Sequence, residues 1–372
     1  MKVLQLGKFY PIRGGVEKVM YDIMLGLSER GIHCDMLCAS TEDYPQEDIK
    51  LNEYATIFVI KTSLKLAATM LAPAMIARLR KIAKDYGIIH IHHPDPMAAL
   101  ALFLSGYTGK VILHWHSDIL KQKTLLKVYK PLQSWLINRA DIIVGTTPVY
   151  VEQSPFLSKY QQKIDYIPIG VLPIVADKSR VQAIRKANEG KVLVFSLGRL
   201  VEYKGFDYLI QAARYLPEYY KIVIGGKGPL HSSLAELIQV HNLEEKVELL
   251  GFLSDEEAYA YFEASAMYVL SSTMKTEAFA IVQIEAMSCG KPIITAHIPG
   301  SGVSWVNENE ISGLICERNN SEDLANKINL IGNNGLLYSR LHEGARSRFE
   351  NYFHRDVMID KTLSIYNKLL KA

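Results

Sequence analysis

Short apolar stretches typical of strands alternate along the chain with longer segments whose apolar residues recur at helical spacing. Residues 2–9 form the first apolar stretch, and residues 14–31 follow with the periodicity of a helix that Gly31 closes. Further strands are expected at residues 33–39, 88–93, 110–116 and 141–146. Such alternation predicts a parallel sheet covered by helices.

The pattern breaks at residues 166–179, where two prolines and a glycine suit a linker between domains, and then restarts. Strands are expected at residues 191–198, 221–226, 246–251, 266–272, 291–295 and 313–317, and helices at 205–215, 231–240 and 254–264. A chain of 372 residues is too long for one ordinary core. We therefore expect an α/β protein with two doubly wound domains.

Three segments are candidates for a secretory signal, a membrane helix and a C-terminal helix. The apolar start of the chain is too short for a secretory signal, and it leads into a glycine loop. The strongest candidate for a membrane helix, residues 65–84, is interrupted by Pro73 and ends in several bases, so an amphipathic helix or a helix pair is expected there. The last 35 residues also have a helical pattern.

Composition narrows the possible partners. Hydrophobic residues make up 49% and charged residues 22% of the chain, and the net charge of +3 gives no reason to expect nucleic acid. Residues 1–171 carry 20 Lys and Arg against 15 Asp and Glu, whereas the rest carry 22 against 24, which indicates an anionic acceptor or a membrane surface for the first half. The four cysteines form no C-x-x-C pair and are expected to be free thiols in a reducing compartment.

Ligands of parallel α/β sheets bind beyond the carboxyl ends of the strands, so the residues that follow each strand are the candidates for chemistry. Gly14 and Gly15 precede the first helix, where they suit either a bound phosphate or a tight turn. His114, His116 and Asp118 alternate at another strand end and superficially resemble a metal site, but no third and fourth ligands follow at suitable spacing. A histidine that donates a hydrogen bond to a substrate and a structural histidine both remain open.

Two cations follow the first strand of the second domain. Arg199 and Lys204 flank a short loop before a helix that Gly205 opens, which suits a diphosphate as well as an ordinary solvated loop. The run "GGKGPL" at residues 225–230 resembles a dinucleotide fingerprint, but His231 stands where the third glycine belongs. We therefore expect no nicotinamide cofactor.

Two carboxylates mark the stretch "EAFAIVQIEAMSCGKPIIT" at residues 277–295. Glu277 is expected at the start of a helix, with the free N–H groups of residues 278–281 beside it. Glu285 would then lie about 80° beyond two full turns, so that both carboxylates can border one cleft. The alternative is a glutamate at a helix start followed by an exposed one.

Taken in order, "GGVEK", "HWHSDI", "GRLVEYKG", "GGKGPL" and "EAFAIVQIEAMSCGKPII" resemble the family 4 glycosyltransferases over essentially the whole chain. The resemblance implies the GT-B fold, in which two Rossmann-like, doubly wound parallel-sheet domains face a central cleft. Residues 1–170 would form the acceptor-binding domain, with the helix at residues 353–371 packed back on it. Residues 171–352 would form the domain that binds the nucleotide-sugar donor.

The resemblance also implies the roles of single residues around the donor. Gly15 would contact the diphosphate from the first domain, and Arg199 and Lys204 would clamp it from the second. His116 would contact the donor sugar near the bond that breaks. Since two protein cations serve the diphosphate and the chain has no D-x-D motif, neither a metal nor a cofactor is expected.

The two-glutamate stretch carries the remaining implied contacts. Glu277 would approach the sugar and the reaction centre, and Glu285 would bind the ribose hydroxyls. Backbone groups would hold sugar and phosphate oxygens at Ala278, Phe279, Ala280 and Ile281. The chain departs from the family at Ala280, where glycine is common, and this departure concerns the identity of the donor sugar.

The expected reaction is retaining transfer of a hexose, with GDP-mannose as the expected donor. The expected acceptor is a polyprenyl-diphosphate-linked saccharide in bacterial O-antigen or surface-polysaccharide biosynthesis. Basic residues within 78–84 and 120–130 suit peripheral contact with anionic lipid at the cytoplasmic face of the membrane as well as an ordinary solvated helix face. The alternatives are a UDP-sugar transferase, a GT-B sugar-nucleotide epimerase, a glycoside hydrolase and a subunit that binds sugar nucleotides without turnover.

Overall fold

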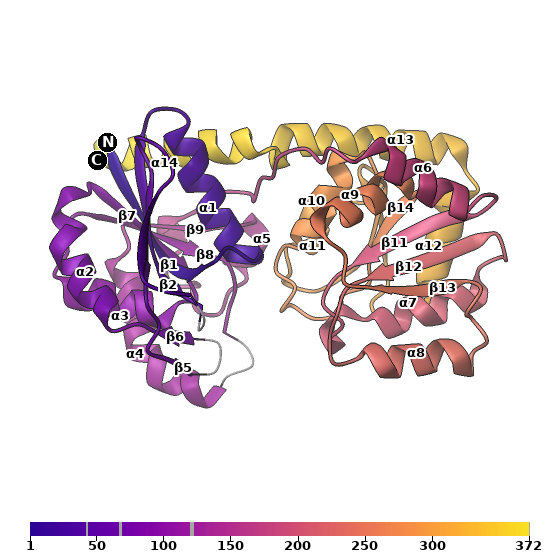
Figure 1. Cartoon of the computed structure of the whole chain (residues 1–372), viewed down its shortest axis with the longest axis horizontal. Helices are drawn as coiled ribbons and strands as arrows, with labels where there is room; N and C mark the ends of the chain where they lie inside the picture. The colour runs from indigo at the N-terminus through magenta and orange to yellow at the C-terminus, as the bar shows by residue number, and fades with distance from the viewer. Residues whose placement is uncertain (42–43, 67–68, 120–122, 372) are drawn as a thin grey trace. The chain divides into compact units, whose positions relative to one another are not determined.

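The computed structural model describes residues 1–41, 44–66, 69–119 and 123–371. Its contacts divide the chain into two units, Met1–Gly170 with Arg355–Ala372 as unit 1 and Val171–His354 as unit 2 (Figure 1). Each unit has a sheet and helices of its own. The acceptor-binding role of the first domain and the donor-binding role of the second stay predictions.

Unit 1 is built on an eight-stranded sheet in the order β10-β9-β8-β7-β1-β2-β4-β3. All neighbours are parallel except β3 and β4. The strands are β1 (Lys2–Tyr10), β2 (His33–Ser40), β3 (Glu47–Lys50), β4 (Thr56–Ile60), β7 (Ile88–His93), β8 (Lys110–Trp115), β9 (Ile142–Gly145) and β10 (Ile164–Tyr166). The helices are α1 (Gly15–Ser28), α2 (Ala74–Ile82), α3 (Pro96–Ser105), α4 (Lys123–Arg139), α5 (Pro148–Glu152) and α14 (Arg355–Lys371).

The helical prediction for residues 65–84 is only half right. Its first part forms a separate antiparallel pair, β5 (Leu64–Leu66) and β6 (Thr69–Leu71). Pro73 caps the following helix, α2, where a proline is tolerated because the first N–H groups lack intrahelical partners. In the described part of the chain, no helix is long and apolar enough to span a membrane.

Unit 2 contains a fully parallel six-stranded sheet in the order β13-β12-β11-β14-β15-β16. The strands are β11 (Val192–Leu197), β12 (Tyr220–Gly225), β13 (Val247–Gly251), β14 (Met267–Leu270), β15 (Ile293–Ala296) and β16 (Gly313–Cys316). The helices are α6 (Lys178–Ala187), α7 (Phe206–Ala212), α8 (His231–Val240), α9 (Asp255–Ala264), α10 (Ile281–Ser288), α11 (Val303–Val306), α12 (Ser321–Gly332) and α13 (Gly335–Arg348). A π-helical turn, Phe349–Phe353, follows α13.

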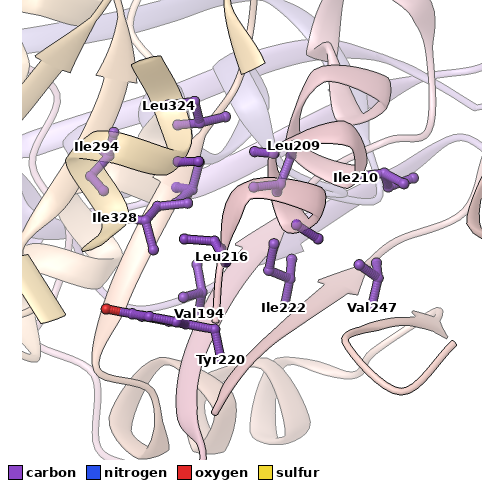
Figure 2. Packing of buried hydrophobic residues seen from close by; sticks show 14 of the residues in the cluster. Val194, Leu209, Ile210, Leu216, Tyr220, Ile222, Val247, Ile294, Leu324 and Ile328 are labelled. Atoms are coloured by element: carbon purple, nitrogen blue, oxygen red, sulfur yellow. The ribbon is translucent and has the colours of Figure 1, made fainter. Parts of the chain in front are cut away.

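One core of unit 2 fills the space between its sheet and the helices α7 and α12. Figure 2 shows Val194 and Ile222 of the sheet beside Leu216, with Leu209 of α7 and Ile328 of α12 above them. These side chains are almost completely buried. Because buried parallel strands are apolar on both faces, the strands of this unit stand out in the sequence as continuous apolar runs.

The C-terminal helix α14 packs on α1 within unit 1 (Figure 1). Gly26 of α1 makes this close approach possible, because a Cβ atom there would lie 2.7 Å from Cγ1 of Ile359. Tyr366 of α14 is fully buried and reaches the sheet, where its hydroxyl accepts a hydrogen bond of 3.0 Å from Gln5 Nε2. The last helix is therefore part of the unit 1 core.

We expect Gly26→Leu to lower the free energy of unfolding of unit 1 by about 1–3 kcal/mol, since the larger side chain overpacks the contact with Ile359. Urea denaturation checks this. Adding Ile359→Ala to Gly26→Leu makes room, so the double variant should be more stable than the sum of the two single effects predicts. Strictly additive effects would contradict direct packing between the two positions.

Candidate active site

The strand order of unit 2 places its candidate site. The chain winds from β11 to β13 in one direction and from β14 to β16 in the other, so the switch point lies between β11 and β14. Ligands of such sheets bind beyond the carboxyl ends of the strands at this point. The loops that follow these two strands meet there, because Thr273 N donates to Tyr203 O at 2.8 Å and Ser271 Oγ donates to Lys204 O at 2.9 Å.

Lys204 and Glu277 form a buried ion pair across these two loops. Lys204 Nζ lies 2.6 Å from Glu277 Oε2, and the two residues are only 9% and 8% exposed. Ser272 Oγ donates to the same carboxylate oxygen at 2.8 Å, and Ser301 Oγ donates to the backbone carbonyl of Glu277. The pair is thus held by hydrogen bonds that fix the carboxylate and satisfy part of its lone pairs.

Glycines let the surrounding backbone segments approach closely. Gly205 has φ +62°, and a Cβ atom there would lie 2.3 Å from Ser271 O. Gly226 has φ +136°, and a Cβ atom there would lie 1.9 Å from Gly198 O. The G-x-G run at residues 226–228 therefore lets the loop after β12 pack closely on the loop after β11.

The helix at the two-glutamate stretch begins later than expected. Glu277 lies in the turn before α10, which starts at Ile281, so the prediction that Glu277 sits at a helix start is wrong. Of residues 278–281 only Ile281 is helical, and the estimated angle between the two glutamates does not apply. The physical reason is Ala280, whose left-handed backbone, φ +62°, interrupts the helical path.

The left-handed backbone at Ala280 also explains why glycine suits this position in the family pattern. Glycine adopts positive φ without cost, whereas an alanine in the left-handed region lowers the stability of the folded chain by roughly 1–2 kcal/mol. Ala280 is buried at 8% exposure, so its methyl group is held inside the loop. The turn keeps its shape with alanine, at some cost in stability.

The other predicted residues of unit 2 border the same loops. Arg199 lies two residues beyond the end of β11 and is exposed, and its side chain makes no ion pair with any described residue. Glu285 lies on the second turn of α10 and is half-buried. Lys204, Glu277 and the start of α10 are therefore brought together by the fold, with Arg199 on the loop that leads to Lys204.

The switch point of unit 1 lies between β1 and β7. Gly15 begins α1 with φ +56° and is exposed, so its backbone is accessible at the helix start. Lys8, at a bulge near the end of β1, donates from Nζ to Pro94 O and from its backbone N to Asp95 Oδ2, both at 2.6 Å. Burial lowers the pKa of Lys8 and raises the pKa of Asp95 and of Glu17.

His116 belongs to a buried stack of four imidazoles beside this point. His114 and His116 come from β8 and its end, and His90 and His92 come from β7, which pairs with β8 so that His92 lies opposite His114. The ring centroids of His114 and His116 are 4.0 Å apart with an angle of 17° between the planes. His92 Nδ1 and His116 Nε2 share a hydrogen bond of 2.9 Å.

Only half of this stack, His114 and His116, stands out in the sequence as candidate chemistry. The alternating histidines of "IIHIHH" were assigned only to a strand, although residues at i and i+2 of a strand share one face. Their pairing with β8 was the missing information. The nitrogens of His90, His92 and His114 lie within 4.8 Å of one another. The rings are nearly parallel, however, at 11° for His90 and His114, so their in-plane lone pairs do not converge on one ion.

Burial keeps these histidines neutral. It lowers the pKa of His114 to about 3 and the pKa of His90, His92 and His116 well below the usual value. The pKa of His93, on the opposite face of the sheet against Trp115, is also lowered well below the usual value by burial. His116 is therefore a neutral hydrogen-bonding group with Nε2 already engaged by His92.

Comparison with known proteins decides the family. The profile described as Glycosyltransferase Family 4 matches residues 13–172, and the profile described as Glycosyl transferases group 1 matches residues 177–348. The chain is 33% identical to the O-antigen chain mannosyltransferase C of Escherichia coli, over 100% of both proteins. The chain belongs to the family 4 glycosyltransferases. This glycosyltransferase is also 30% identical to the D-rhamnosyltransferase WbpZ of Pseudomonas aeruginosa, over 85% of its own length and 82% of the relative.

Solved structures agree with the fold. The glycosyltransferase matches sucrose-phosphate synthase of Thermosynechococcus elongatus with a TM-score of 0.79 at 18% identity, over 100% of both chains. It matches Anabaena HepE in complex with UDP with a TM-score of 0.78 at 21% identity, over 99% of its own chain and 100% of the other. The prediction of the GT-B fold is confirmed.

Breaking the buried pair should destabilise unit 2. Lys204→Met leaves the Glu277 carboxylate buried without its cation, and we expect a loss of about 3–5 kcal/mol in the free energy of unfolding, measured by urea denaturation. The double variant Lys204→Met/Glu277→Gln should recover most of this loss.

An exposed pair of the same unit supplies the control. Lys221 and Glu248 lie 2.7 Å apart with half of the glutamate side chain in solvent, so Lys221→Met should cost less than about 1 kcal/mol. Equal losses from Lys204→Met and Lys221→Met would contradict the argument from burial.

Acid should unfold unit 1 through its histidines. Their pKa values are lower in the folded chain than in the unfolded one, so the unfolded chain binds more protons below about pH 6.5, and stability is lost as pH falls. Each buried histidine contributes up to about 1.4 kcal/mol per pH unit below its unfolded pKa, so five of them together lower the stability steeply as the pH falls below about 6.5. Raised carboxyl pKa values, as in Asp95, partly offset this at lower pH.

Urea midpoints followed by tryptophan fluorescence between pH 7.5 and pH 5 measure the effect. His114→Gln should flatten the pH dependence, whereas His231→Gln, which changes an exposed residue of unit 2, should leave it unchanged. A midpoint independent of pH in the unsubstituted protein would contradict the prediction.

Proposed function

We propose that this glycosyltransferase transfers a hexose, with retention of anomeric configuration, from GDP-mannose to a polyprenyl-diphosphate-linked saccharide. The reaction would be a step of O-antigen or surface-polysaccharide assembly. The observation that carries the proposal is the full-length similarity to an O-antigen mannosyltransferase. The second relative transfers D-rhamnose, which is D-mannose without its terminal hydroxyl, so a sugar of manno configuration accords with both names.

We assign donor binding to the loops after β11 and β14. Lys204 has three N–H donors, so it can keep its bond to Glu277 and still donate to a phosphate oxygen. Arg199 lies on the same loop and has no ion-pair partner among the described residues, and a guanidinium binds phosphate in bidentate fashion. The positive end of the α10 dipole adds to these charges, with the backbone of Ala278, Phe279, Ala280 and Ile281 leading into it. Glu285 is proposed for the ribose hydroxyls.

The proposed chemistry follows from a diphosphate leaving group. The bond from the anomeric carbon to the phosphate oxygen breaks, negative charge develops on the β-phosphate, and Arg199 and Lys204 stabilise it. The acceptor hydroxyl forms the new bond on the same face of the sugar, and its proton passes to the leaving phosphate. Glu277 lies beside Lys204 and is proposed to orient the sugar and to stabilise its positive charge.

Two residues of unit 1 complete the proposal. Gly15 presents an accessible backbone at the start of α1, which suits a phosphate oxygen. His116 is neutral, and its buried Nδ1 has no partner among the described residues, so we propose that the donor sugar supplies this partner. No divalent ion is needed in this scheme, because two protein cations and helix starts carry the charge of the diphosphate.

A UDP-sugar is the second candidate donor. The structural neighbour HepE was solved with UDP and with UDP-glucose, at 20–21% identity to this chain. The proposed clamp grips the diphosphate, which GDP-mannose and UDP-glucose share. Donor choice would then depend on the contacts of the base and of the sugar.

Arg199→Ala should weaken the binding of GDP-mannose by about 1.5–3 kcal/mol, because a charge-assisted hydrogen bond to phosphate is lost. Isothermal titration calorimetry measures this, and Arg199 is exposed, so the variant should fold. Arg214→Ala, which also removes an exposed arginine of unit 2, should leave the affinity unchanged. Equal affinities for GDP-mannose in Arg199→Ala and the unsubstituted enzyme would refute the proposed role of Arg199 in binding the diphosphate.

Mass spectrometry of the products tests the reaction itself. GDP-mannose, UDP-glucose, UDP-galactose and UDP-N-acetylglucosamine are each incubated with a lipid-diphosphate saccharide, with and without EDTA. Turnover only with a UDP-sugar would refute the donor, and loss of turnover in EDTA that magnesium restores would refute metal independence. Isomerised donor without transfer would indicate an epimerase, and free sugar would indicate a hydrolase.

A further inference from the structure

Unit 1 carries an apolar pocket that none of the proposed donor contacts uses. It has a volume of about 260 Å³ and lies among β5, β6, α3 and α4. Its walls are mostly aliphatic and include Leu66, Leu71, Met97, Leu100, Val128 and Leu132. A pocket lined in this way favours a hydrocarbon ligand, since it offers few groups that could replace lost hydrogen bonds to water.

The edge of the pocket leaves large apolar side chains in water. Val128 is 81% exposed and Leu66 is 53% exposed, and neighbouring Leu64 is 60% exposed. Exposed aliphatic residues gathered around an apolar pocket are typical of a binding surface, whereas scattered ones are ordinary. A ligand that covered them would gain hydrophobic free energy in proportion to the area removed from water.

The charge around the pocket indicates which end group the ligand carries. Residues 61–84, which include β5, β6 and α2, contain six Lys and Arg and no Asp or Glu. Residues 96–140, which include α3 and α4, contain six Lys and Arg and one acid, Asp118. The Asp118 carboxylate accepts hydrogen bonds from Trp115 and Ser154, so it is directed into the fold. Of these cations, Arg78 pairs with Asp48, and Lys110 and Arg139 pair with Asp141. The positive charge that can attract an anion next to the pocket therefore comes from the exposed Lys127 and Lys130 of α4.

On α4 the apolar lining of the pocket and the positive charge beside it occur within one helical turn. Lys127 and Lys130 are exposed, and between them Val128 and Tyr129 line the pocket. A chain that lies in the pocket can thus carry a phosphate within reach of lysine side chains. This combination fits an amphiphile with one apolar chain and an anionic head.

We propose that this pocket binds the isoprenoid chain of the acceptor next to its diphosphate. The inference rests on the proposed function, which supplies a polyprenyl-diphosphate-linked acceptor, and it adds the place where the chain is recognised. A partly enclosed pocket of this volume suits a segment of one chain. The leucines and valine hold the chain, and the basic surroundings hold the diphosphate.

Binding of farnesyl diphosphate to the full-length protein by isothermal titration calorimetry tests the proposal without turnover. Each methylene removed from water is worth about 0.8 kcal/mol, which is about fourfold in affinity. Farnesyl diphosphate should therefore bind at least about tenfold more tightly than inorganic diphosphate. Leu100→Gln and Val128→Glu should each lower the affinity for farnesyl diphosphate about tenfold, since they place polar groups in the pocket.

The chain offers matched controls for both variants. Leu104 lies one turn beyond Leu100 on α3, has the same exposure of 37% and does not line the pocket, so Leu104→Gln should bind farnesyl diphosphate as the unsubstituted protein does. Val175 is 86% exposed in unit 2, and Val175→Glu should likewise have no effect. All four positions are partly or largely exposed, so the variants should fold.

Three results would overturn the proposal. Equal affinity for inorganic diphosphate and farnesyl diphosphate would show recognition of phosphate alone. Equal loss in the pocket variants and in their controls would place the chain elsewhere. Binding of phosphatidylglycerol vesicles that the pocket variants lose, without binding of farnesyl diphosphate, would assign the surface to a bilayer. Failure of the proposed function is seen separately, as absence of hexose transfer to a lipid-diphosphate saccharide while farnesyl diphosphate still binds.

Discussion

The ion pair of Lys204 and Glu277 is the interaction on which the candidate site of unit 2 depends. It joins the loop after β11 to the loop after β14, at the point where the strand order of the sheet reverses. Two buried charges are stable only when they are paired and hydrogen-bonded, and here Ser272 completes the arrangement. Because a phosphate oxygen can join the same ammonium group, the contact that holds the loops also prepares them for an anion.

Close backbone packing makes this pairing possible. Gly205 and Gly226 stand where any side chain would collide with a carbonyl oxygen, so the loops after β11, β12 and β14 approach more closely than side chains would allow. Ala280 holds the turn before α10 in a left-handed conformation that glycine adopts more easily. The geometry of the site is therefore a property of backbone conformation as much as of its charged groups.

Unit 1 differs from unit 2 in the groups that border its switch point. Its switch point is bordered by neutral histidines that stack between β7 and β8, and by Lys8, whose ammonium is directed to a carbonyl. Burial makes charged imidazoles costly, so the stack provides hydrogen-bonding atoms without added charge. The apolar pocket among β5, β6, α3 and α4 and its basic surroundings lie on the same unit. The acceptor role proposed for this unit thus has a surface whose chemistry suits a lipid diphosphate.

The sequence by itself determined the α/β class, most strands and helices, and the loops that carry the candidate site residues. Periodicity and glycine punctuation are local signals, so β7, α8 and the loop with Arg199 and Lys204 could be predicted directly. Only the tertiary structure decided that Lys204 binds Glu277, that α10 begins after Ala280, that residues 64–66 and 69–71 pair as strands and that His90 and His92 join His114 and His116. These features depend on strand register and on contacts between residues far apart in the chain, which local patterns do not encode.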